Sequence, residues 1–228
     1  MGATVRARPL LLDLFCGAGG AAVGYHQAGF DVIGVDVAWK RDYPFDFIQA
    51  DVFDVLRSPG DYLPSVDVVH ASPPCQAFTR ARVTRLEERA HPDLITPLRP
   101  LLLASGLPFV IENVDHAPLV DPVRVCMAQV LRADGFELRR HRWFETNWTA
   151  WPLGCGCGEL PAAPVFGHGP GRDFYKVHGR GFTVDAMRRI MGVPWMRSRD
   201  DIVEAIPPAF AAYIGEQLIE LLARRVAI

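Results

Sequence analysis

The sequence predicts an α/β fold built on a doubly wound, mostly parallel sheet. Short apolar runs rich in Val, Ile and Leu alternate with helical stretches through the first two-thirds of the chain. The first run breaks directly into a glycine-rich turn, and later runs end in polar or reactive side chains. Alternation of this length is typical of βαβ units, whose parallel sheet is covered on both faces. Ligands of such folds bind outside the carboxyl ends of the strands.

Buried strands are expected where four to six mostly apolar residues follow one another, at Leu10–Phe15, Asp31–Val35, Phe47–Ala50, Val66–Ala71 and Phe109–Asn113. Crossover helices are expected where apolar residues recur with helical spacing, at Ala21–Ala28, Asp51–Leu56 and Pro122–Ala133. Gly135–Thr146 is expected to form a further strand or a hairpin.

The composition changes near Trp151. Residues 152–181 contain eight glycines and four prolines without a sustained period, which predicts a loop-rich segment. Helices are expected to return at Thr183–Met191 and at Pro207–Arg225, the second opened by prolines at positions where a helix tolerates them. The chain thus divides into residues 1–151, 152–182 and 183–228.

Size and charge limit the possible classes of protein. A chain of 228 residues can bury one sizeable core. No apolar run approaches the roughly 18–20 residues of a membrane span, and no signal peptide is expected. Five cysteines, an odd number, favour a reduced, cytoplasmic compartment. A net charge of −2 gives no global attraction to nucleic acid, so any phosphate contact must come from local clusters.

The turn after the first strand has the features of a nucleotide-binding loop. Gly17, Gly19 and Gly20 allow close approach of a ligand, and Asp36, about 20 residues on, is suited to bind ribose hydroxyls. The spacing is not that of a dinucleotide fingerprint. Asp13 would repel a pyrophosphate but attract an ammonium group, so S-adenosylmethionine fits this loop better than NAD.

Cys75 is the candidate nucleophile. Pro73 and Pro74 keep the chain extended before it, which places the thiol in a loop at the exit of a strand. We expect a nearby cation or helix terminus to lower its pKa toward neutrality. Cys16 and Cys126 are expected to be buried structural cysteines.

Five segments follow one another along the chain: Asp13 to Gly20, Pro74-Cys75-Gln76, Glu112-Asn113-Val114, Arg140-His141-Arg142, and Ile206-Pro207-Pro208 with Ile214-Gly215. Together they resemble the motifs of the DNA cytosine-5 methyltransferase family. Asp13 to Gly20 is similar to its first motif, Pro74-Cys75-Gln76 to its catalytic motif and Glu112-Asn113-Val114 to its acid motif. Arg140-His141-Arg142 resembles its paired arginines, and Ile206-Pro207-Pro208 with Ile214-Gly215 resembles its closing helix. The short chain also looks like methylases carried by bacteriophages. The resemblance implies a Rossmann-like, S-adenosylmethionine-dependent methyltransferase fold.

The resemblance also implies a mechanism. A cytosine flipped out of DNA would be attacked at carbon 6 by Cys75 while Glu112 binds the ring. Arg142 would contact the base or stabilise developing charge, and Arg140 would steady the base or a phosphate. Carbon 5 would then take the methyl group of S-adenosylmethionine, which leaves S-adenosylhomocysteine.

For the cofactor, the resemblance implies that Phe15 packs on the adenine, Asp36 holds the ribose and Asp51 accepts from the adenine amine. The resemblance also implies that Pro74 closes over the cofactor. The remaining expected cofactor contacts lie in these segments or directly beside residues already named: Asp13, Cys16, Gly17, Gly20, Val37, Val52 and Ala205. Two residues depart from the family pattern, since Glu204 replaces an asparagine and Val37 a common aromatic residue.

By this resemblance, we expect residues 1–151 to form the catalytic domain and residues 152–182 a very small target-recognition segment. Residues 183–228 are expected to form helices that return to the catalytic domain. Contacts to double-stranded DNA are expected from Gln76, Thr79, Arg80, Arg82, Arg172, Lys176 and Arg180. Since one arginine–guanine pair supplies about 1–3 kcal/mol of discrimination, a target of about two to four bases is expected. The protein is expected to act as a monomer.

Three alternatives remain open. The substrate could be RNA or a free nucleotide, because the recognition segment is tiny, or the chain could be a non-catalytic nucleic-acid-binding relative. A zinc site could join Cys155 and Cys157 to His168 or His178. The one-residue gap between the cysteines and the lack of a second Cys pair argue against that site, so no metal is expected.

Overall fold

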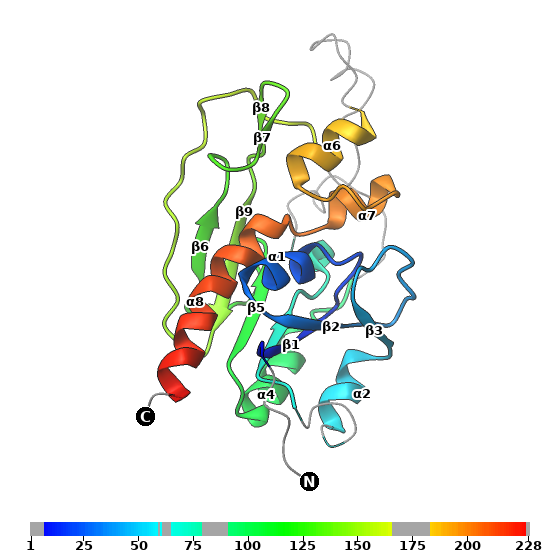
Figure 1. Cartoon of the computed structure of the whole chain (residues 1–228), viewed down its shortest axis with the longest axis vertical. Helices are drawn as coiled ribbons and strands as arrows, with labels where there is room; N and C mark the ends of the chain where they lie inside the picture. Colours follow the sequence, from blue (N-terminus) through cyan, green and yellow to red (C-terminus); the bar gives the residue numbers. More distant parts are fainter. Residues whose placement is uncertain (1–6, 59, 61–64, 79–90, 166–182, 227–228) are drawn as a thin grey trace.

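A central sheet dominates the computed structural model, which describes residues 7–58, 60, 65–78, 91–165 and 183–226. Within these ranges seven strands are hydrogen-bonded in the order β3-β2-β1-β4-β5-β9-β6 (Figure 1). Their bounds are β1 Leu10–Leu14, β2 Asp31–Asp36, β3 Asp46–Gln49, β4 Val68–Ala71, β5 Phe109–Asn113, β6 Val123–Cys126 and β9 His141–Thr146. β7 (Arg132–Ala133) and β8 (Phe136–Glu137) form a separate small ribbon.

The first five strands are parallel, and chain order reverses between β1 and β4. β9 runs antiparallel to both β5 and β6. The doubly wound, mostly parallel sheet predicted from the sequence is therefore confirmed. The reversal creates a topological switch point at the carboxyl ends of β1 and β4, where open α/β sheets bind ligands.

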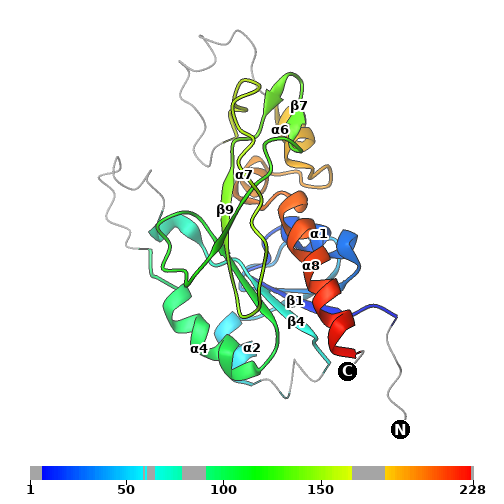
Figure 2. The same cartoon turned by 90° about the vertical axis from the view of Figure 1, so that its left-hand side faces the viewer.

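Helices cover both faces of the sheet (Figures 1 and 2). α1 (Gly20–Ala28) and α8 (Pro208–Val226) lie on one face, and α2 (Val52–Arg57) and α4 (Ile95–Ser105) on the other. Side chains alternate across β1, so that Leu11 joins the core under α1 and α8, whereas Leu12 joins the core over α2 and α4. Burial of these two apolar layers holds the sheet in place.

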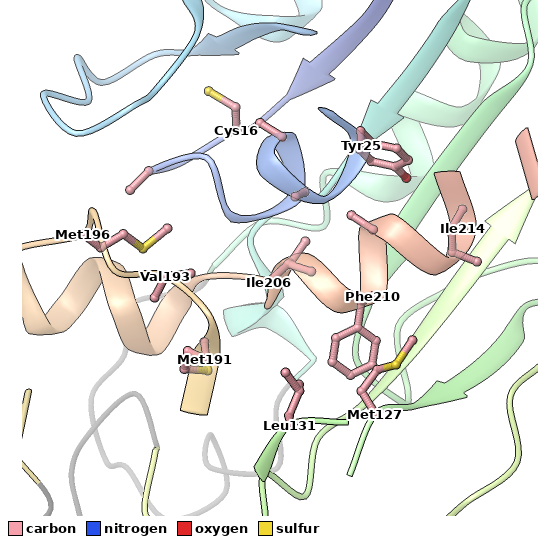
Figure 3. Packing of buried hydrophobic residues seen from close by; sticks show 14 of the residues in the cluster. Cys16, Tyr25, Met127, Leu131, Met191, Val193, Met196, Ile206, Phe210 and Ile214 are labelled. Carbon is pink, nitrogen blue, oxygen red and sulfur yellow. The ribbon is translucent and has the colours of Figure 1, made fainter. Parts of the chain in front are cut away.

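α8 packs tightly against α1. Glycines make this approach possible: a Cβ added at Gly24 would lie 2.2 Å from the carbonyl oxygen of Pro208, and one at Gly215 would lie 2.7 Å from Cβ of Ala28. Figure 3 shows Phe210 and Ile214 of α8 in the same apolar layer as Tyr25 of α1. Residues near the C-terminus are thus part of the core that supports the first strand.

Two further helices continue this layer. Thr183 caps α6 (Val184–Met191) by accepting from the backbone N–H of Ala186, and α7 (Arg199–Glu204) ends just before Ala205.

Among the described helices, none combines the length and the apolar character that a membrane crossing requires.

All five predicted strands are confirmed within two residues of their ends, and so are the helices at α1, α2, α6 and α8. The helix predicted over Pro122–Ala133 is wrong, because Val123–Cys126 pairs with β9 as a strand and a turn follows. α4 and α7 were not predicted. Gly135–Thr146 does contribute strands, in β8 and β9.

Candidate active site

A cavity of about 960 Å³ opens at the carboxyl ends of the parallel strands. Its walls come from the β1–α1 loop, the end of β2, the segment after β4, the end of β5 and the chain around Ala205. Nearly all the described residues that the sequence assigned to a site lie on these walls: Phe15, Cys16, Gly17, Gly20, Asp36, Val37, Asp51, Val52, Pro74, Cys75, Gln76, Glu112, Arg140, Arg142 and Ala205. Segments far apart in the chain therefore meet in one site.

Cys75 begins a short 3-10 turn, Cys75–Ala77, directly after the two prolines. The side-chain amide of Asn113 donates to the carbonyl oxygen of Pro73 at 2.9 Å, which ties the cysteine loop to the end of β5. Burial raises the pKa of the Cys75 thiol, the charge of Glu112 adds to this rise, and the guanidinium groups of Arg142 and Arg140 oppose it. The expectation that the pKa of Cys75 is lowered is therefore wrong for the protein without bound ligands, because the effect of burial outweighs that of the two cations.

Glu112 and Arg142 form an ion pair on the cavity wall. Nε of Arg142 lies 2.7 Å from Oε1 of Glu112, whose residue is only 5 % exposed. Oε1 accepts no aligned hydrogen bond from any described residue, so the carboxyl group retains bonding capacity for a ligand. Burial raises the pKa of Glu112, although Arg142 and Arg140 counteract it, which favours the protonated acid more than in water.

Arg140 lines the cavity but is also a structural tie. Its guanidinium donates to the carbonyl oxygens of Ala205 at 2.9 Å, Val203 at 2.8 Å and Val165 at 3.2 Å. Burial, together with the nearby charge of Arg142, lowers the pKa of Arg140 to about 9, so the group is still cationic at neutral pH. The expected contact with base or phosphate would have to coexist with these three bonds.

The glycine-rich loop is held by Asp36. Oδ2 of this residue accepts from the backbone N–H of Gly17 at 3.1 Å, and Oδ1 accepts from that of Ala38 at 3.0 Å. Phe15 lies in the left-handed region with φ of 57°, a conformation that costs free energy for a side chain with a Cβ and is often found at ligand sites. A Cβ at Gly20 would lie 2.2 Å from the carbonyl oxygen of Ile206, so only glycine fits there.

Asp13 is the exception among the described site residues. Its side chain is 0 % exposed and does not line the cavity, because it projects from β1 toward the α1 face together with Leu11. There it lies 3.9 Å from Nε2 of His70, whose Nδ1 contacts the hydroxyl of Tyr25 at 2.9 Å. Burial raises the pKa of Asp13. The predicted contact between this carboxylate and an ammonium group is corrected accordingly.

Other wall residues were not predicted. Lys40 and Asp201 form an ion pair at 3.3 Å on the cavity wall, and Ser72 joins them there. Lys40 comes shortly after Asp36, the last residue of β2, and this position in the sequence could have identified Lys40 as a wall residue. Glu204, the departure from the family pattern, also lines the cavity. Oδ1 of Asp51 caps α2 through the backbone N–H of Phe53 at 2.7 Å.

The expected DNA-contacting residues other than Gln76 lie outside the described residues: Thr79, Arg80, Arg82, Arg172, Lys176 and Arg180. His168 and His178 lie outside them as well. Gln76 itself lies on the cavity wall next to Cys75.

Comparison with known proteins adds independent findings. A family profile described as C-5 cytosine-specific DNA methylase matches residues 10–122. The chain is 31 % identical over 119 residues to the type II methyltransferase M.HgiGI of Herpetosiphon aurantiacus, which covers 47 % of this chain and 92 % of that protein. It is 30 % identical over 120 residues to M.XorII of Xanthomonas oryzae, covering 47 % of this chain but only 28 % of that longer relative.

Solved structures share the fold across almost the whole chain. A protein described as a DNA modification methyltransferase encoded within an E. coli prophage superposes with a TM-score of 0.60 at 15 % identity, covering 94 % of this chain and 99 % of that one. The S. pombe Dnmt2 methyltransferase superposes with a TM-score of 0.54 at 13 % identity and the same coverage. At these identities the similarity establishes the architecture alone.

Proposed function

The chain belongs to the C-5 cytosine-specific DNA methylase family, and we propose that it transfers a methyl group from S-adenosylmethionine to carbon 5 of cytosine in DNA. The observation that carries the proposal is the meeting of Cys75, Glu112 and Arg142 with the Asp36 loop in one cavity. A thiol nucleophile, an acid and a cation beside a nucleoside-binding loop are the groups that this reaction requires.

The reaction begins with a cytosine outside the base stack, because its ring carbons are unreachable within a duplex. The sulfur of Cys75, after loss of its proton, forms a bond to carbon 6, and the double bond between carbons 5 and 6 opens. Carbon 5 then carries the electron pair that accepts the methyl group. Release of the carbon-5 proton to solvent and breakage of the bond from sulfur to carbon 6, whose electron pair leaves with the sulfur, restore the aromatic ring and free Cys75 as a thiolate.

Glu112 supports the attack. Its raised pKa favours a protonated carboxyl, which can donate to nitrogen 3 of the ring while the second oxygen accepts from the exocyclic amine. A proton held at nitrogen 3 draws electron density from carbon 6, the atom that sulfur attacks. Arg142, 2.7 Å from Oε1, keeps this carboxyl oriented and places a positive charge beside the thiol.

The cavity fits S-adenosylmethionine, whose sulfonium makes its methyl group electrophilic. Asp36 presents a fixed carboxylate to ribose hydroxyls, and Phe15 and Val37 offer apolar surface to adenine. Val37 is 71 % exposed, as expected for a side chain that a ligand would cover. Lys40 and Asp201 supply charges suited to the amino-acid end of the cofactor.

We further propose that residues 152–182 form a reduced recognition segment between the catalytic domain, 1–151, and the returning helices, 183–228. Arg80, Arg82, Arg172, Lys176 and Arg180 would supply contacts to double-stranded DNA, and a short target of about two to four bases follows from so few side chains. The protein would act as a monomer in the cytoplasm of a bacterial or phage-infected cell.

A substrate panel tests the proposal. Purified protein is incubated with methyl-labelled S-adenosylmethionine and, separately, duplex DNA, tRNA and dCMP, with the Cys75→Ala variant as control. We expect label in DNA only, and none with the variant. Label in tRNA or dCMP would redirect the proposal to the RNA or nucleotide alternative, and cofactor binding without transfer to any substrate would favour a non-catalytic role.

The target follows from the same protein. Bisulfite sequencing of DNA from cells that express the wild-type chain, compared with cells that express Cys75→Ala, should reveal protected cytosines in one short sequence context. Protection spread evenly over all cytosines would contradict the proposed recognition segment without contradicting the chemistry.

A further inference from the structure

Three cysteines and a histidine lie close together at the end of the sheet where β6 pairs with β9. Cys126 ends β6, and His141 begins β9 directly opposite it in the antiparallel register. Cys155 and Cys157 come from the segment that follows β9. One ligand atom from each of the four residues lies within 4.8 Å of all the others. Cys126 is buried, His141 and Cys157 are half-buried, and Cys155 is exposed.

Three of the separations between these atoms are close to those of a tetrahedral zinc site, and every pair lies within 4.8 Å. With Zn–S of about 2.3 Å and Zn–N of about 2.1 Å, a tetrahedron separates two sulfurs by about 3.8 Å and a sulfur from a nitrogen by about 3.6 Å. Sγ of Cys126 and Sγ of Cys157 are 3.5 Å apart. Nε2 of His141 is 3.3 Å from Sγ of Cys155 and 3.6 Å from Sγ of Cys157.

The surrounding chain holds the two loop cysteines in this arrangement. Gly156, between them, packs against the exposed side chain of Gln129, which lies 2.4 Å from where a Cβ of residue 156 would be. Beyond the turn, the buried carboxylate of Glu137 accepts from the backbone N–H groups of Gly158 at 2.6 Å and Leu160 at 3.1 Å. The loop is therefore positioned by a polar anchor, as the ligands of structural metal sites commonly are.

We propose that Cys126, His141, Cys155 and Cys157 bind one structural Zn²⁺ ion. Three thiols release their protons to solvent on binding, the histidine coordinates as the neutral ring through Nε2, and four protein ligands leave no open position for catalysis. The proposal departs from the sequence expectation of no metal.

The site has a consequence for the active site, in a step that rests on the proposed function. His141 stands between Arg140 and Arg142, and successive side chains of a strand point to opposite faces. A metal bound at His141 would thus fix the start of β9, where Arg140 just before the strand and Arg142 within it both line the cavity. It would also anchor the segment that leads toward residues 166–182.

Metal analysis of the purified protein tests the site. Protein expressed with added zinc and desalted without chelator should contain one zinc ion per chain. Cys155→Ser is the first variant, because this exposed residue can be changed without disturbing the core, and Cys126→Ser and His141→Ala follow. Each should lose most of the zinc, whereas Cys75→Ser, the matched cysteine control, should retain it while losing methyl transfer. Full zinc content in Cys155→Ser and Cys126→Ser would overturn the proposal.

A second readout does not depend on variants. Cobalt(II) added to the metal-free wild-type chain should give the visible absorption of a tetrahedral site with thiolate ligands, and zinc should abolish that absorption. Removal of zinc should lower Tm by about 5 °C or more. Wild-type protein that binds neither ion, or that contains stoichiometric iron instead, would contradict the zinc assignment. Because activity is read separately, failure here leaves the proposed methyl transfer intact, and the converse also holds.

Discussion

Nε of Arg142 lies 2.7 Å from Oε1 of Glu112, at the wall of the cavity that also contains Cys75. The pair joins β5 to β9, two antiparallel neighbours. It sets opposite electrostatic influences on the thiol, since Arg142 lowers the pKa of Cys75 and Glu112 raises it. The pKa of this thiol therefore depends on its burial and on two charged side chains from different strands.

Thiol reactivity tests this balance. Because burial places the pKa of Cys75 above its ordinary value, alkylation by iodoacetamide should accelerate as pH rises into the alkaline range. Arg142→Gln removes the cation and should move the midpoint of that curve to higher pH, whereas Glu112→Gln removes the anion and should move it to lower pH. Mass spectrometry of the peptide containing Cys75 measures the rate.

Arg124→Gln is the matched control, because Arg124 is an exposed arginine of the neighbouring strand β6 and does not line the cavity. Its curve should coincide with that of the wild type. A shift of the Arg142→Gln midpoint toward lower pH would show that the arginine does not influence the thiol as described.

Asp36 should govern cofactor affinity. Both of its oxygens are aligned by backbone N–H groups, of Gly17 and Ala38, so the carboxylate is presented in one orientation. Asp36→Ala should weaken S-adenosylmethionine binding by about tenfold or more, the loss of a charge-assisted hydrogen bond. Isothermal titration measures Kd, with Asp54→Ala, an exposed acid on α2, as control. Unchanged affinity in the Asp36 variant would argue against the nucleoside assignment of this loop.

Gly24→Ala should loosen the joint between α1 and α8. The added Cβ would lie 2.2 Å from the carbonyl oxygen of Pro208, so one helix must move. We expect a loss of about 1–3 kcal/mol in the free energy of unfolding, the usual cost of overpacking. Urea denaturation measures it, and Gly60→Ala, where the new Cβ meets open space, is the control. Equal stabilities of the two variants would contradict the close approach.

Glu137 should make the stability of the cysteine loop depend on pH. The pKa of Glu137 is lowered to about 2. The largest cause is the hydrogen bond from the backbone N–H of Gly158, and the guanidinium of Arg139 adds to it. A carboxyl with a lowered pKa in the folded state stabilises it above the ordinary value near 4.5, and this contribution is lost as pH falls toward 2. The stability difference between wild type and Glu137→Gln should therefore be largest at neutral pH and shrink on acidification. A difference that stays constant with pH would contradict this anchor.

Much of the fold was predictable because apolar runs mark buried parallel strands. The failures have physical reasons. Val123 and Val125 were read as part of a helix, yet their alternation suits a strand that pairs with β9, and only the tertiary partner decides between the two. α4 was missed because Pro100 lies inside it. Burial of Ile95, Leu98 and Leu102 on the sheet offsets the lost backbone hydrogen bond.

The candidate site was predictable where its residues belong to contiguous motifs, since each motif carries its own loop geometry. Asp13 was misassigned because a motif gives no direction for a side chain, whereas the alternation along β1 turns this carboxylate toward His70. The meeting of Cys126 with His141 depends on the register of two antiparallel strands. That register could not be derived from the spacing of the cysteines along the chain.

A covalent trap tests whether the sulfur of Cys75 bonds to carbon 6 of cytosine. In the test DNA, 5-fluorocytosine replaces every cytosine of the duplex, so the target sequence is present whatever it is. Fluorine cannot leave carbon 5 as a proton does, so the bond between sulfur and carbon 6 cannot be released. With S-adenosylmethionine present, we expect a complex that resists denaturation and is absent in Cys75→Ala. Peptide mapping should show that the bond to DNA is made through Cys75. A protein that binds this DNA and the cofactor yet forms no adduct, or forms one through another residue, would show that Cys75 is not the nucleophile.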